Sequence, residues 1–138
     1  MNIKRISVAD VELIAYSLAK EFWEFDETIP NFSSRFPHAL ESCLAVPFQR
    51  FSYKTFYRGL TGKSAILFYL MVKNHPFQNG NKRIAMTTLF VFLHRNKKWL
   101  RVGERELYEF AKWVAESNPR LMNETVKAIE KFIRSYII

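Results

Sequence analysis

The amino-acid sequence predicts an all-α protein, a helical bundle interrupted once by a short β-like flap. Apolar residues recur at helical spacing in most of the chain, and prolines or glycines separate these segments. Only the aromatic stretch Phe48–Tyr53, which follows a proline, is expected to be extended. The 138 residues suit one domain, residues 1–138, that buries roughly two thirds of its unfolded surface. Because the chain has 13 Phe, 6 Tyr and 3 Trp, we expect an aromatic-rich core.

The first part of the chain predicts one long helix and one short helix. Ser7 and Asp10 have the spacing of a capping box, and apolar residues at helical spacing follow them, which predicts a helix over about residues 8–24. The polar segment Asp26–Ser34 is expected to be a loop. Pro37 suits the first turn of a short helix that ends before the next proline.

The second part of the chain predicts further helices. Their expected ranges are Thr61–Asn74, Asn81–Arg95, Glu104–Glu116 and a last helix after Pro119. Within the first of them, Ala65–Val72 is apolar on every face, so this helix is expected to be central and buried, with Thr61 as its N-cap. The helix that begins at Asn81 should pack against it as an antiparallel or steeply crossed pair.

Composition limits the partners and the compartment. The formal net charge of +8 and the pI of about 9.7 predict an anionic partner: a nucleotide, a nucleic acid, an acidic protein or a membrane surface. The charge alone does not choose among these. Cys43 is the only cysteine, so an intrachain disulfide is impossible. The sequence shows neither a signal-peptide pattern nor an apolar run long enough for a bilayer, so we expect a cytoplasmic protein with no membrane partner.

The loop after the central helix combines residues that handle phosphate. His75 opens it, Gly80 allows a sharp turn, and Lys82 and Arg83 follow closely. Histidine has an ordinary pKa of about 6.5 and can serve as a base near neutral pH. If Asn81 begins the next helix, the first N–H groups of that helix and the positive end of its dipole point at the same loop. A base and an anion-binding turn are therefore expected to face one site.

These residues suit the transfer of a phosphoryl or nucleotidyl group to a hydroxyl. Such a reaction needs a base near the hydroxyl and donors around the phosphate. Arg83 can bind phosphate oxygens in a bidentate manner, whereas Lys82 supplies a point charge. Phe77, an apolar residue in a polar loop, is expected to anchor the loop in the core. Magnesium normally accompanies nucleotide phosphates and prefers carboxylate ligands, but the loop contains no Asp or Glu.

At these residues the sequence resembles the Fic/Doc, or Fido, family. The family signature is His-x-Phe-x-(Asp/Glu)-(Gly/Ala)-Asn-(Gly/Lys)-Arg, between two central helices. The positions in register are His75, Phe77, Gly80, Asn81 and Arg83. Lys82, in place of glycine, resembles the Doc, or death-on-curing, branch. The resemblance extends to the flanking helices and covers most of the chain.

The resemblance implies a mainly helical Fido fold. In it, His75 would remove the proton from a hydroxyl of a target protein, and residues 80–83 would hold the phosphates of ATP or another nucleoside triphosphate. Doc-like members transfer the terminal phosphoryl group to a Ser or Thr hydroxyl, with translation elongation factor Tu as target, and are toxins paired with an antitoxin protein. Lys82 favours this branch. The alternative is the transfer of AMP, as in the Fic branch.

The family also has a flap that aligns the target segment by backbone pairing. The resemblance places this flap at Phe48, Gln49, Arg50, Phe51, Ser52 and Tyr53. The aromatic residues of Phe48–Tyr57 could stack on nucleic-acid bases, but packing in the core under a flap is the commoner use of such residues.

Two positions depart from the family pattern. Asn79 stands at the acidic position that holds magnesium, and its amide oxygen is a weaker ligand than a carboxylate. Asn79 also suits a turn, since asparagine tolerates left-handed backbone. Met86 stands where AMP-transferring members have a second arginine, which again favours the Doc branch. A third function therefore stays open: a catalytically weak module that binds nucleotide or nucleic acid.

The remaining reactive side chains have simpler interpretations. His38 and His94 lack comparable neighbours in the sequence and are expected on the surface or on a helix face. Cys43 lies in a short apolar helix and is expected to be a small buried side chain rather than a nucleophile. The family's inhibitory helix has no good match, so inhibition in cis is not expected.

Overall fold

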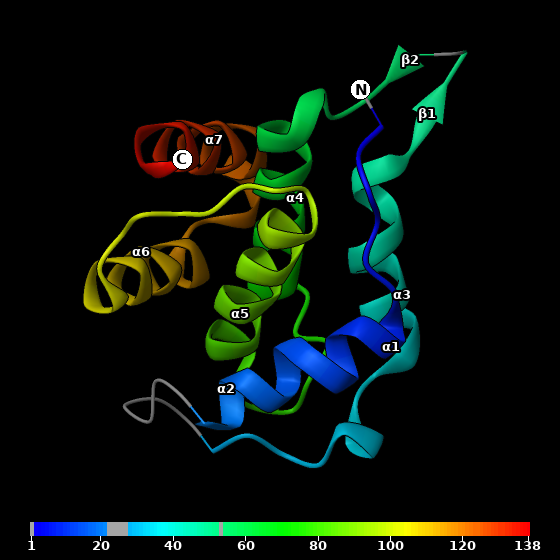
Figure 1. Cartoon of the computed structure of the whole chain (residues 1–138), viewed down its shortest axis with the longest axis vertical. Helices are drawn as coiled ribbons and strands as arrows, with labels where there is room; N and C mark the ends of the chain where they lie inside the picture. Colours follow the sequence, from blue (N-terminus) through cyan, green and yellow to red (C-terminus); the bar gives the residue numbers. More distant parts are fainter. Residues whose placement is uncertain (1, 22–27, 53) are drawn as a thin grey trace.

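The computed structural model describes residues 2–21, 28–52 and 54–138 of the chain. Over these residues the protein is mainly helical, as predicted, and its one sheet is a two-stranded hairpin (Figure 1). The helices are α1 (Val8–Asp10), α2 (Ser17–Glu21), α3 (Pro37–Ala45), α4 (Gly59–Lys73), α5 (Asn81–Arg95), α6 (Glu104–Glu116) and α7 (Met122–Tyr136). The strands are β1 (Arg50–Phe51) and β2 (Lys54–Thr55). None of the helices in these ranges is long and apolar enough to cross a bilayer.

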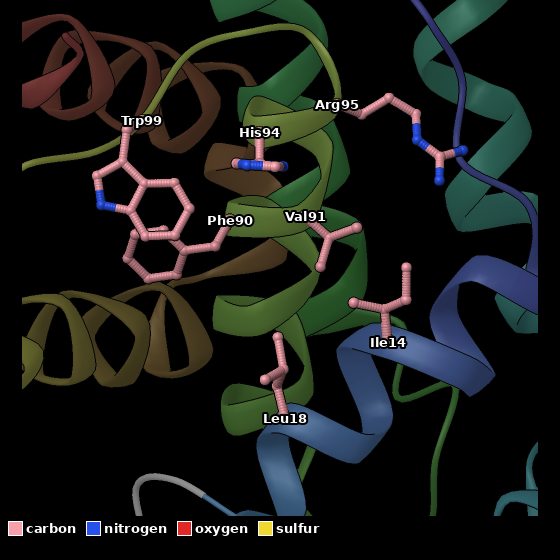
Figure 2. Close-up of a pocket in the computed structure, with 7 residues that line it drawn as sticks. All are labelled: Ile14, Leu18, Phe90, Val91, His94, Arg95 and Trp99. Atoms are coloured by element: carbon pink, nitrogen blue, oxygen red, sulfur yellow. The ribbon is translucent and has the colours of Figure 1, made fainter.

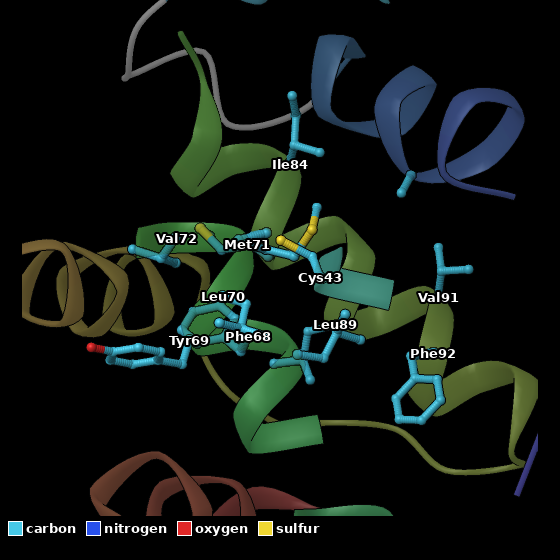
Figure 3. Packing of buried hydrophobic residues seen from close by; sticks show 14 of the residues in the cluster. Cys43, Phe68, Tyr69, Leu70, Met71, Val72, Ile84, Leu89, Val91 and Phe92 are labelled. Carbon is cyan, nitrogen blue, oxygen red and sulfur yellow. The ribbon is translucent and has the colours of Figure 1, made fainter. Parts of the chain in front are cut away.

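The centre of the fold is the pair α4 and α5, which run side by side in opposite directions (Figure 1). The predicted burial of Ala65–Val72 is confirmed, because every residue of this stretch is buried. Figure 3 shows apolar side chains of α4 and α5 gathered in this core together with Cys43 from α3. The start of α4 differs from the prediction: the N-cap position is Arg58 rather than Thr61. Gly59, with φ of +67°, turns the chain into the helix earlier.

The first helix forms as its capping pattern predicts. Ser7 Oγ accepts a hydrogen bond from the Asp10 N–H at 3.1 Å, and the Asp10 carboxylate accepts one from the Ser7 N–H at 2.7 Å. Helical structure then continues from α1 through a π-helical segment, Val11–Tyr16, into α2. The end predicted near residue 24 lies outside the described residues.

Two side chains of α5 form hydrogen bonds that hold this first helix against the pair α4 and α5. Arg83 Nη2 donates to the carbonyl oxygen of Ala19 at 2.5 Å. One turn further along α5, Thr87 Oγ1 donates to the carbonyl oxygen of Ala15 at 2.7 Å. The two donors are four residues apart on α5, and the two carbonyls are four residues apart on the first helix. Because the later donor binds the earlier carbonyl, the two helices run in opposite directions. These contacts fix the position of the first helix along α5.

The helices α6 and α7 cover the other side of α4, and the bounds predicted for α6 are confirmed. Their buried apolar residues are Leu107, Ala111, Val114, Ile129 and Ile133. The rings of Phe110 and Phe132 stack between the two helices, with centroids 4.0 Å apart. An ion pair lies along α7, since Arg134 Nη2 is 2.6 Å from Glu130 Oε2. The end of α6 is attached to the end of α4, because Lys73 Nζ donates to the carbonyl oxygens of Ala115 at 3.1 Å and Ser117 at 2.6 Å.

Candidate active site

The loop between α4 and α5 turns on two left-handed residues. Gly80 occupies the N-cap position of α5 with φ of +72°. A glycine reaches this conformation without the steric cost that a Cβ would add. His75 has φ of +47°, which few residues other than glycine adopt, although histidine does so more often than most. The loop thus leaves α4 and enters α5 through two turns that local sequence favours.

The buried side chain of Asn81 holds the loop together by hydrogen bonds to its backbone. Its side chain is 5 % exposed, and it forms a two-way bridge to Phe77: Oδ1 accepts from the Phe77 N–H at 3.0 Å, and Nδ2 donates to the Phe77 carbonyl at 2.8 Å. The same Nδ2 lies 3.4 Å from Nδ1 of His75. The sequence predicted that Asn81 binds phosphate. In the structure its side chain holds the loop, and its backbone N–H, at the first position of α5, has no intrahelical acceptor.

Phe77 lies where an anchor of the loop should lie. It is 1 % exposed, and its ring centroid is 5.7 Å from that of Phe32 and 6.4 Å from that of Tyr16. Tyr16 and Phe32 also contact each other edge to face, with centroids 5.3 Å apart. Three rings from three segments therefore hold the loop against the first helix.

The hydrogen bonds of Asn81 favour one tautomer of the neutral imidazole of His75. Because the Phe77 backbone orients both ends of the Asn81 amide, the donor Nδ2 is the atom that faces His75. Nδ1 of His75 then acts as the acceptor, and Nε2 carries the proton. His75 is exposed, so this N–H is accessible to solvent.

The start of α5 supplies N–H groups for an anion. The first intrahelical hydrogen bond of the helix runs from the Ile84 N–H to the Gly80 carbonyl, so the N–H groups before it have no intrahelical acceptor. Lys82 is half-buried in this first turn. Ile29, however, packs over Gly80: a Cβ placed on Gly80 would lie 2.4 Å from Ile29 Cδ1. The Gly80 side of the turn is therefore covered by Ile29.

Arg83 does not point toward solvent at the loop. It is 5 % exposed, and its guanidinium donates to Ala19 as described above. Arg83 lies three residues after Gly80, on the side of α5 that faces the first helix, and its side chain therefore points toward that helix. Bidentate phosphate binding by Arg83, which the sequence predicted, would require this contact to be exchanged.

The described residues around the loop do not make a good magnesium site. Asn79 is exposed and offers a neutral amide oxygen. Within residues 2–21, 28–52 and 54–138, no three His, Cys, Asp or Glu side chains lie close enough to hold a metal ion. A hard cation of this charge prefers carboxylates, so this donor set fits it poorly.

The structure does not bring the predicted flap to the loop. Phe48 ends a short 3₁₀ turn, Gln49 follows, and Arg50 and Phe51 form β1 opposite β2; Ser52 lies in the turn, and Tyr53 lies outside the described residues. This hairpin precedes α4, whereas His75 follows it, and α4 is about 22 Å long at 1.5 Å per residue. Figure 1 shows the two at opposite ends of α4.

A different segment borders His75, namely residues 28–36. The Phe36 N–H donates to the Pro76 carbonyl at 2.9 Å. Tyr16 Oη donates to the Pro30 carbonyl at 2.5 Å, which holds the segment beside the first helix. The sequence indicated only a polar loop here. The sequence did contain a signal that this segment packs against the core: Ile29 and Phe32 are apolar residues in an otherwise polar loop. The same feature led to the prediction that Phe77 anchors its loop.

An apolar groove of the described chain lies away from this loop. It has a volume of about 250 Å³ between the first helix and the later turns of α5 (Figure 2). Its lining residues are Ile14, Leu18, Phe90, Val91, His94, Arg95 and Trp99. His94 is exposed at its edge, as expected, and lies on α5 far from the turn at Gly80. The groove is therefore not part of the loop site.

Cys43 is also separate from the loop site. Its side chain is fully buried in α3, and this burial raises the pKa of its thiol to about 12. A thiol with such a pKa is not ionised near neutral pH and is a poor nucleophile. The expectation of a small buried side chain is confirmed.

Comparison with known proteins gives one match. The model of the family described as "Fic/DOC family" matches residues 5–93, which is more than half of the chain. The matched range runs from the capping box of the first helix through most of α5 and includes the whole His75 loop. No curated protein and no solved structure matches the chain.

Proposed function

Because the chain belongs to the Fic/DOC family, whose members are generally nucleotide-utilising transferases, we propose that it is a Doc-like phosphotransferase. It moves the terminal phosphoryl group of ATP or another nucleoside triphosphate to a Ser or Thr hydroxyl of a target protein. The observation that carries the proposal is the arrangement of the loop: an exposed histidine lies in the loop that leads directly into the first turn of α5, whose N–H groups have no intrahelical acceptor.

The charge at the start of α5 supports an anionic ligand. Lys82 lies in the first turn, where the positive end of the helix dipole disfavours a cation. A bound phosphate removes this conflict, because it interacts favourably with both the ammonium group and the N–H groups. Lys82 is half-buried, so part of its side chain is exposed to solvent where such a ligand would bind.

In the proposed reaction His75 is the base. The target oxygen forms a bond to the terminal phosphorus, while the bond from that phosphorus to the bridging oxygen breaks and the nucleoside diphosphate leaves. The hydroxyl proton passes to an imidazole nitrogen of His75. The N–H groups of α5 and the ammonium of Lys82 stabilise the phosphoryl oxygens as charge moves toward the leaving group.

The tautomer of His75 adds one requirement. If the target hydroxyl meets Nε2, the ring must first carry its proton on Nδ1, which gives up the contact with Asn81. The contact is 3.4 Å long, at the weak end of hydrogen bonding, so little is lost. Because the ring is exposed, water can exchange the two tautomers.

Two residues favour phosphoryl transfer over AMP transfer. Lys82 stands at the position that resembles the Doc branch, and its side chain adds bulk and charge next to the phosphates. Met86, at the position of a second arginine in AMP-transferring relatives, is fully buried and apolar. No second guanidinium therefore reaches the phosphates from that position.

Label transfer tests the proposal. The protein is incubated in a cell lysate with magnesium and ATP labelled at either the α or the γ phosphate. The expected result is a protein band from the γ label alone, which His75→Asn reduces by about 10²–10⁴-fold, the usual contribution of a general base. Asn is the matched substitution because it tolerates the left-handed backbone of this position. A band from the α label would show AMP transfer instead.

A second candidate function rests on Asn79. Because the described donor set fits magnesium poorly, the chain could bind a nucleotide without transferring a group. No band with either label, together with measurable ATP binding, would support this binding module. A band that depends on His75 would exclude it.

The proposed function implies protein partners. The target is a protein hydroxyl, and an elongation factor Tu-like protein and an antitoxin are proposed from the family resemblance alone. The target segment would reach His75 past residues 28–36, because this segment borders the loop, while the hairpin lies at the far end of α4. Identification of the labelled band by mass spectrometry tests the target.

A further inference from the structure

The hairpin and its neighbours form a surface that the proposed reaction does not use. Figure 1 shows β1 and β2 standing away from the helices, beside the N-terminal segment and at the end of α4 opposite the His75 loop. We call this surface the hairpin patch. Its residues are Arg5, Arg50, Phe51, Lys54, Phe56 and Arg58. All six are exposed.

The patch exposes two large aromatic rings. Phe51 is 70 % exposed and Phe56 is 61 % exposed, whereas nearby Phe48 packs against Phe92 in the core, ring centroids 6.1 Å apart. The expectation that the aromatic residues of this region fill the core is therefore wrong for Phe51 and Phe56. Solvated phenyl rings cost free energy in isolation, so two of them on one projection indicate a surface that meets a partner.

The rings are interleaved with cations. Phe51 and Lys54 are directly opposite each other in the antiparallel hairpin, so their side chains lie on one face of it. Arg50 pairs with Thr55 in the same register, and Arg58 follows Phe56 by two residues. The patch thus alternates flat apolar rings with long positively charged side chains.

One further cation, Lys63, lies under the patch. Lys63 is only 6 % exposed; its Nζ donates to the Tyr57 carbonyl at 2.6 Å and lies 5.6 Å from the centre of the Phe48 ring. Arg5 stacks on the same ring at 4.4 Å. Burial first, and then the charges of Arg5 and Arg50, lower the pKa of Lys63. Positive charge is concentrated at the base of the hairpin.

The segment that carries the hairpin has no acidic residue of its own. Between Glu41 and Glu104 there is no Asp or Glu, although Lys and Arg recur throughout. The carboxylate of Glu130, from α7, lies near Gly62 and pairs with Arg134. A patch of this kind attracts a polyanion, and a polyanion with flat apolar faces can use both of its components.

We propose that the hairpin patch binds single-stranded nucleic acid. Phe51 and Phe56 stack on successive bases, while Arg50, Lys54 and Arg58 contact the phosphates. A single strand is favoured over a duplex because its base faces are free to meet the exposed rings. An acidic protein would satisfy the cations but would not use two exposed rings in this way.

Fluorescence anisotropy with a labelled oligouridine of about twelve nucleotides tests the proposal, over a series of salt concentrations. Phe51→Ala should weaken binding about tenfold, with the salt dependence unchanged, because stacking carries no charge. Arg50→Gln and Lys54→Gln should each lower the slope of log K against log salt by about 0.7, the value for one phosphate contact on a single strand. The folded state of each variant is checked by thermal unfolding.

Matched controls separate the patch from the general charge of the protein. Lys127→Gln with Lys131→Gln removes two exposed positive charges from α7, and Leu13→Ala shortens an apolar residue that is 73 % exposed on the first helix. Neither control should change affinity as the patch variants do. His75→Asn should bind the oligonucleotide normally, which keeps this result independent of the proposed transferase activity.

Three results would overturn the proposal. The first is an equal loss of affinity in the α7 double variant, which would indicate attraction by net charge alone. The second is unchanged binding in both Phe51→Ala and Phe56→Ala, which would remove the stacking role. The third is tighter binding of a poly-glutamate peptide than of the oligonucleotide, which would identify an acidic protein as the partner.

Discussion

The side chain of Asn81 joins His75 to the backbone of Phe77. One amide group accepts and donates a hydrogen bond at Phe77 while its donor also faces the imidazole at 3.4 Å. The anchor of the loop, its proposed base and the first residue of α5 are thereby held as one unit. A change at Asn81 should consequently affect the position of His75 and the stability of the fold together.

Asn81→Ala tests this unit. The substitution leaves the buried N–H and carbonyl of Phe77 without their partner, which should lower the free energy of unfolding by about 1–3 kcal/mol. Urea denaturation of the variant and the wild-type protein measures this difference. A variant as stable as the wild type would show that Phe77 alone holds the loop.

The resting tautomer of His75 can be observed directly. Because the Asn81 amide donates toward Nδ1, we expect ¹⁵N spectra to show the proton on Nε2 when the imidazole is neutral. Asn81→Ala removes this preference and should shift the population toward the other form. A resting ring that carries its proton on Nδ1 would mean that the Asn81 contact does not orient His75.

Arg83 and Lys82 should separate stability from nucleotide binding. Arg83→Ala leaves the Ala19 carbonyl without its donor, so the free energy of unfolding should fall by about 1–3 kcal/mol. Lys82→Ala removes a positive charge from the first turn of α5 and should weaken ATP binding about tenfold. Thermal unfolding and isothermal titration of the two variants provide the comparison. An unchanged melting temperature in Arg83→Ala would contradict the anchoring role.

Ile29 covers the Gly80 side of the proposed phosphate site. Ile29→Ala should open this side and strengthen ATP binding by about tenfold, or about 1.4 kcal/mol. Gly80→Ala should have the opposite effect, because its Cβ would meet Ile29 and its φ of +72° would strain any L side chain. If Ile29→Ala leaves the ATP affinity unchanged, phosphate binds only on the Lys82 side.

Asn79→Asp tests the weakest part of the proposed site. A carboxylate at this exposed position would supply the ligand that magnesium prefers, so transfer by the variant should exceed that of the wild type at low magnesium concentration. A magnesium titration of γ-label transfer measures the effect. Equal magnesium dependence of both proteins would indicate that position 79 takes no part in metal binding.

Asp10 gives the fold a predictable dependence on acid. Burial alone would raise the pKa of Asp10, but its hydrogen bonds with Ser7 and Arg95 and the charge of Arg95 outweigh this, so the pKa is lowered. The carboxylate binds Arg95 through two contacts of 2.8 and 3.0 Å. Its stabilising effect is therefore present above the unfolded value of about 4 and is lost as the pH falls through the lower folded value.

Asp10→Asn should remove this pH-dependent stabilisation. At pH 7 the variant should be less stable by about 1 kcal/mol, the usual size of a helix-capping contribution. The difference from the wild type should shrink as the pH drops below about 4, where the wild-type carboxylate becomes protonated. Chemical denaturation at several pH values measures it. A difference that is constant down to the lowest pH would contradict the ionised pair.

The sequence by itself determined the features that depend on neighbouring residues. The bounds of α5 and α6, the capping box at Ser7 and the burial of Ala65–Val72 were all predictable, because helix caps and apolar periodicity act within a few residues along the chain. The same holds for the composition of the His75 loop. These local signals were sufficient for the fold class and for the position of the candidate site in the chain.

Only the tertiary structure decided which segments meet. The direction of Arg83 depends on Ala19, 64 residues away, and the covering of Gly80 depends on Ile29. The hairpin was expected beside His75, but a rigid helix of about 22 Å separates them, and residues 28–36 take that place. Such contacts follow from how whole helices pack, and packing between distant segments leaves no periodic pattern in the local sequence.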